Sequence, residues 1–188
     1  MATSIKISAT SSQRLQDFLE ENNLHKKDFA EMIGVTLSYV YSLIGAEVSF
    51  STRSTTIERI AVVMNVDPES FPEYKHSEEP RLIDPGVQYL KDRQIKLGLS
   101  NVQLLKRFAR SLRVDIVDMW RGSLPLPIDW VQLTSIGDVL GVSKDELYPF
   151  WEMRLQQHLI VGGVDPLSNA PLMQSMFRGI REYLKIKV

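Results

Sequence analysis

An internal repeat is the strongest constraint on the fold, because the same order of helical patterns occurs twice in the chain. The segment "NLHKKDF" at 23–29 corresponds to "GLSNVQL" at 98–104, an offset of 75 residues. "MNVDPESF" at 64–71 corresponds to "LGVSKDEL" at 140–147, an offset of 76 residues. Self-similarity at a fixed spacing indicates that one structural unit is used twice. The 188 residues are therefore expected to form two related modules rather than one large domain.

Both copies show helical periodicity. Apolar residues recur every three or four positions, and no stretch alternates as a half-buried strand would. We therefore expect an all-α fold, with five short helices in the first copy and a later helix that begins at Pro149. Local signals for helix caps and turns are Thr10 or Ser12, Gly34, Thr36, and the capping boxes Ser100 with Gln103 and Ser143 with Glu146.

Composition shifts along the chain predict its domain organisation. The first module covers 10–74, a linker rich in proline and charge covers 75–86, and the second module covers 87–150. Residues 151–188 form a C-terminal helical extension whose last helix carries an apolar stripe. Two alternatives remain for this stripe: it docks on the second module, or it pairs two copies of the chain as a homodimer.

Several function classes are excluded by what the sequence lacks. There is no cysteine, the three histidines do not have metal-ligand spacing, and no nucleotide-binding loop or nucleophile motif occurs. We expect neither an enzyme nor a cofactor nor a metal site. No apolar run approaches the roughly 20 residues of a membrane helix, so the expectation is a cytoplasmic protein that does not engage a membrane.

The first copy resembles a known family. "FAEMIGVTLSYVYSLIG" at 29–45 has an apolar residue paired with alanine, a glycine-containing turn, and inward Val40 and Leu43. This pattern is similar to the Cro/C1-type (XRE-like) helix-turn-helix regulators, and "TIERIAVVMNVDPESF" continues it with the fourth and fifth helices. The resemblance implies two tandem helix-turn-helix domains, the second degenerate, in a transcriptional regulator that binds double-stranded DNA.

The resemblance also implies which residues of the first copy meet DNA. The start of the second helix grips backbone phosphate, and the exposed side of the third helix enters the major groove. The corresponding residues are Lys26 and Lys27 for phosphate, and Thr36, Leu37, Ser38, Tyr39, Tyr41 and Ser42 for the groove. Arg53, in the loop that follows, adds a backbone contact. The groove-facing set holds no Arg, Lys, Asn or Gln, the residues whose paired base contacts each give about 1–3 kcal/mol of discrimination.

The second copy differs in the placement of its charge. Residues 76–122 carry nine basic and six acidic side chains, whereas residues 1–75 carry seven and ten. Lys106, Arg107, Arg110 and Arg113 recur at helical spacing and are predicted to form one cationic stripe along a DNA backbone. Asp115 and Asp118 on the following helix would repel phosphate, so that helix is not expected to read a groove.

Two functions are compatible with this pattern. The first is a DNA-binding regulator in which the first module contacts the major groove and the second adds backbone contacts or acts as a scaffold. The second is a protein-interaction module on the same fold, which the uncharged third helix and the acidic first copy favour.

Overall fold

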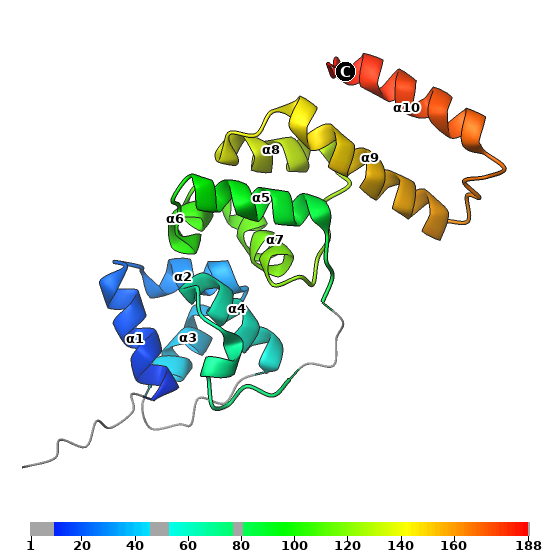
Figure 1. The fold of residues 1–188 in the computed structure, drawn as a ribbon. Coiled ribbons are helices and arrows are strands. Elements are labelled where there is room, and N and C mark those ends of the chain that lie inside the picture. Colours follow the sequence, from blue (N-terminus) through cyan, green and yellow to red (C-terminus); the bar gives the residue numbers. More distant parts are fainter. Residues whose placement is uncertain (1–9, 46–52, 77–80, 188) are drawn as a thin grey trace, which may run out of the picture. The chain divides into compact units, whose positions relative to one another are not determined.

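The computed structural model describes residues 10–45, 53–76 and 81–187. Every regular element in these ranges is helical and none is a strand, which confirms the all-α class (Figure 1). The fold divides into two compact units. Unit 1 is built from the described residues of Met1–Arg81 and Ser100–Ser123, and unit 2 from those of Leu82–Leu99 and Leu124–Val188.

Unit 1 is a helical cluster with one apolar core. Its elements are α1 (Ser11–Glu21), α2 (Lys26–Ile33), α3 (Leu37–Ile44), α4 (Ser54–Met64), the 3-10 turn η1 (Pro68–Ser70), α6 (Asn101–Lys106) and α7 (Arg110–Trp120). Helix α2 packs against α3, α4 and α7, and α4 also packs against α6. The largest buried side chains include Phe29, Ile33, Ile57, Ile60 and Ile116.

The predicted caps of the first copy are confirmed. Thr10 Oγ1 accepts a hydrogen bond from the Gln13 amide, and Thr36 Oγ1 accepts one from the Tyr39 amide, each at 3.2 Å. These side chains satisfy amide groups that have no partner inside the helix. The fifth predicted helix is only the turn η1, which the Asp67 side chain caps.

Gly34 is required at the turn between α2 and α3. Its φ of 70° is in the left-handed region, and an added Cβ would lie 3.1 Å from both Arg59 Nη1 and Val114 Cγ2. Replacing Gly34 by alanine is expected to lower the free energy of unfolding by about 2 kcal/mol, because backbone strain of roughly 1 kcal/mol is joined by crowding. Urea denaturation of the variant measures this loss.

Gly98 provides the matched control for that substitution. Its φ is +64°, but an added Cβ would meet no atom of the described residues within 4 Å, its chain neighbours apart. Gly98→Ala should therefore show the backbone strain alone, about 1 kcal/mol. Equal losses for the two variants would contradict a role for close packing at the Gly34 turn.

Unit 2 consists of α5 (Pro85–Lys96), α8 (Trp130–Leu140), α9 (Lys144–Val161) and α10 (Ala170–Leu184). Helix α9 contacts α5 and α8. The predicted helix start at Pro149 is wrong, because the capping box of Ser143 and Glu146 begins α9 at Lys144 and Pro149 lies inside the helix. The Ser100 and Gln103 capping box is also present, at the start of α6 in unit 1.

The two units do not follow the predicted domain boundaries. Helices α6 and α7 of the second copy belong to unit 1, whereas α5, α8 and α9 of the same copy belong to unit 2 with α10. Residues 77–80 of the predicted linker lie outside the described residues, and α5 already begins at Pro85. The helices of the second copy are thus divided between the two units. The helix-turn-helix character of the two copies remains a prediction.

The C-terminal helix α10 docks within unit 2. Phe177 is buried, and its carbonyl accepts a hydrogen bond from Tyr148 Oη at 3.3 Å. Arg181 Nε and Nη2 both donate to the Glu152 carboxylate. Leu172 remains 68% exposed. Docking on α9 accounts for part of the predicted apolar stripe, and pairing of two copies stays a prediction. Among the described residues, no helix has both the length and the apolarity that crossing a membrane requires.

Candidate nucleic-acid interface

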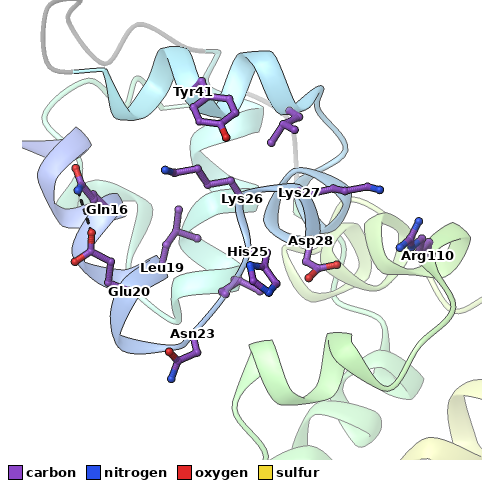
Figure 2. A pocket seen from close by; sticks show the side chains of 12 residues that line it. Gln16, Leu19, Glu20, Asn23, His25, Lys26, Lys27, Asp28, Tyr41 and Arg110 are labelled. Carbon is purple, nitrogen blue, oxygen red and sulfur yellow. Dashed lines mark hydrogen bonds between the residues drawn. The ribbon is translucent and has the colours of Figure 1, made fainter.

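Helices α2 and α3 are joined by the tight turn at Gly34, and an open hollow lies beside them. The hollow, about 920 Å³, lies between the end of α1, the start of α2 and the first turns of α3 (Figure 2). The residues that line it include Leu19, Glu20, Asn23, Leu24, His25, Lys26, Lys27, Asp28, Leu37, Tyr41 and Arg110. The predicted phosphate-binding lysines and part of the predicted groove-facing surface therefore meet at one place.

The outward face of α3 is accessible, as its pattern predicts. Val40 and Leu43 are buried, so the opposite side of the helix faces solvent. Thr36, Leu37, Ser38, Tyr41 and Ser42 are exposed, and Tyr39 is half-buried. The face is rich in hydroxyls and apolar atoms and carries no formal charge. Two of its hydroxyls are already engaged: Thr36 accepts the cap hydrogen bond, and Ser42 Oγ donates to the Ser38 carbonyl at 3.1 Å.

Lys26 and Tyr41 are adjacent across the hollow. The Lys26 Nζ lies 5.1 Å from the centre of the Tyr41 ring, within the range of a cation–π contact. In Figure 2, Lys26 points towards Tyr41, while the exposed Lys27 extends towards the side on which Arg110 lies. One cation is thus held against the aromatic part of the α3 face, and a second extends from the next residue of α2 in the opposite direction.

The predicted cationic stripe does not exist as one helical face. Lys106 is the last residue of α6, Arg107 lies in the turn, and α7 begins at Arg110. The helical spacing is interrupted because α6 ends after six residues. Of the four cations, Arg110 alone lines the hollow in the described part of the chain. Arg53 is exposed at the N-cap of α4 and lies outside that lining.

Arg110 and Arg113 are engaged with acidic residues of α2. Arg113 is only 12% exposed, and its Nη1 lies 3.2 Å from Glu31 Oε2 and 3.8 Å from Asp28 Oδ1. Arg110 is 65% exposed, and its Nε lies 3.1 Å from the same Glu31 oxygen. These pairs are absent from the predictions above, because no pattern in the sequence places the start of α7 against α2.

Asp118 has a structural position rather than a solvent-facing one. It is buried, and its carboxylate accepts hydrogen bonds from Arg59 at 2.7 and 2.8 Å and from Arg121 at 2.8 Å. The prediction that Asp118 repels phosphate assumed that its side chain faces solvent, and the buried position of Asp118 contradicts that assumption. Arg121 continues the network to Glu58, which also accepts a hydrogen bond from Tyr74 Oη.

The described residues contain no cluster of three or more His, Asp or Glu side chains arranged to hold a metal ion. Comparison of the chain with family models, curated proteins and solved structures gives no match.

Proposed function

We propose that the protein is a DNA-binding regulator of the Cro/C1-type helix-turn-helix class, with α3 of unit 1 as the element that enters the major groove. The observation that carries the proposal is the position of Lys26 and Lys27 beside an exposed, uncharged face of α3. In a helix-turn-helix, the start of the first helix lies over the backbone when the second lies in the groove. The same docking brings both lysines to phosphate.

The chemistry of the α3 face suits contact without strong base discrimination. Leu37 offers apolar contact to thymine methyl groups, and the hydroxyls of Ser38 and Tyr41 offer hydrogen bonds to phosphate or base edges. Ser42 Oγ, which donates its proton to the Ser38 carbonyl, can accept a hydrogen bond from a base edge. Phosphate contacts position a protein on DNA, whereas paired contacts to base edges specify a sequence. We therefore expect affinity to depend on charge more than on sequence.

A salt-dependent titration tests this function. The full chain is titrated with a duplex DNA of random sequence, and anisotropy is followed at several salt concentrations. If Lys26, Lys27 and Arg53 each contact a phosphate, log K should fall with log salt with a slope of about −2.7, from about −0.9 per contact. Absence of binding at low salt, where counterion release favours it most, would overturn the proposal.

A protein partner is the second candidate, favoured by one specific observation. Tyr41 is 56% exposed and Leu37 is 38% exposed, so two large apolar side chains stand on a face without charge. Interface cores are enriched in aromatic residues and depleted in charge. This candidate would be favoured if the DNA titration shows no binding and if a protein that co-purifies with the wild type is lost after Tyr41→Ser.

A further inference from the structure

Helix α2 carries two acids, Asp28 and Glu31, next to the two lysines with which it begins. Lys27 and Glu31 are four residues apart on α2 and are therefore neighbours on its surface. Asp28 lines the hollow together with both lysines. Unpaired carboxylates on α2 would repel the phosphates that the lysines are proposed to attract.

Helix α7 of the second copy supplies the counter-charges. Arg113, mostly buried, lies within ion-pair distance of both Glu31 and Asp28, and its Nε also donates to the Phe108 carbonyl at 3.3 Å. Arg110 pairs with Glu31 from the solvent side while lining the hollow next to Lys27. Each acid on this side of α2 thus faces a cation from a segment more than 75 residues away in sequence.

We propose that Arg110 and Arg113 act on DNA binding indirectly, by neutralising Glu31 and Asp28 so that the α2 end of unit 1 stays attractive to phosphate. This inference rests on the proposed function. It gives the two arginines a different role from the backbone contacts that the sequence suggested. It would also offset the net charge of −3 over residues 1–75, because α7 packs against α2 and places two cations beside its acids.

A direct contact of Arg110 with phosphate and an indirect role through Glu31 predict different results in a double-mutant cycle of these two residues. Arg110 is well exposed, and Gln at position 31 keeps an oxygen that can accept from Arg113, so both variants are expected to fold; urea denaturation of each variant checks this. Arg110→Gln is expected to weaken binding of a random duplex about fivefold at low salt, and Glu31→Gln to strengthen it about threefold. In the variant that carries both substitutions, affinity should return to within about twofold of the wild type, because the acid that needed neutralising is gone.

Four further outcomes test the inference. Arg110→Lys keeps the charge and should keep wild-type affinity. A double variant as weak as Arg110→Gln, with a salt slope shallower by about 0.9, would show that Arg110 contacts phosphate itself and would overturn the indirect role. A wild-type protein that binds no duplex would overturn the proposed function and this inference together, whereas normal wild-type binding with no change in any variant would overturn the inference alone.

Discussion

Replacing Asp118 by alanine is expected to lower the free energy of unfolding by about 3 kcal/mol. The substitution removes a carboxylate that two arginines share in a mostly buried site, so that both positive charges lose this partner. Arg59 and Arg121 both donate to this carboxylate. Burial disfavours the charged form of Arg121, but its hydrogen bonds to Asp118 and Glu58 outweigh burial and raise the pKa of the guanidinium, so the cation persists. The loss stays at the lower end of the expected range because Arg121 keeps Glu58 and Arg59 keeps the Ile33 carbonyl.

Urea denaturation followed by circular dichroism measures this loss, and hydrogen exchange of amides in α4 and α7 assigns it to unit 1. Asp138→Ala is the matched control, because Asp138 is an exposed carboxylate on α8 in unit 2. Its expected effect is within about 0.5 kcal/mol. A loss below about 1 kcal/mol for Asp118→Ala would mean that desolvation of the three charged groups nearly cancels their attraction.

Features that depend on neighbouring residues in the chain were predicted well. Thr10, Thr36, Ser100 and Ser143 cap helices because a short side-chain oxygen reaches an amide two or three residues ahead, whatever the rest of the protein does. Gly34 takes the left-handed conformation that a tight turn requires. Burial of Val40 and Leu43 follows from helical spacing in the same way.

Features that depend on which helix packs against which could not be read from the sequence. The spacing of Lys106, Arg107, Arg110 and Arg113 is helical, yet the chain turns after Lys106. Nothing in the periodicity shows that α7 packs on α2 and α4. The sequence therefore predicted which side chains of the candidate site are exposed, but not which of its charges are paired. That pairing depends on contacts between residues about 80 positions apart.

The same distinction applies to the repeat. Similar helix order in the two copies predicts similar local structure, because caps and turns are encoded within a few residues. Assembly into compact units depends on the apolar and charged faces that each helix presents. Helix α7 buries Ile116, Val117 and Met119 in unit 1 and adds the Asp118 network, so its best partners belong to the first copy.

Reversing the charge of both lysines at the start of α2 is expected to have the largest effect on DNA binding. Lys26→Glu with Lys27→Glu would remove the two proposed phosphate contacts and add two repulsive charges beside α3. Affinity for a random duplex should fall about 100-fold at low salt, equivalent to about 2.7 kcal/mol. Anisotropy titration measures this change. Loss of the Lys26 contact with the Tyr41 ring should contribute, since the ring then lacks the cation that it packs against.

Lys106→Glu with Arg107→Glu is the matched control, because it changes the net charge of the chain by the same amount. Both residues are exposed and neither lines the hollow. If binding depends on the site formed by α2 and α3, this control should weaken affinity less than about fivefold, through long-range electrostatics that salt screens. Equal losses for the two double variants would show that overall charge governs binding, and the hollow beside α3 would then have no special role in DNA recognition.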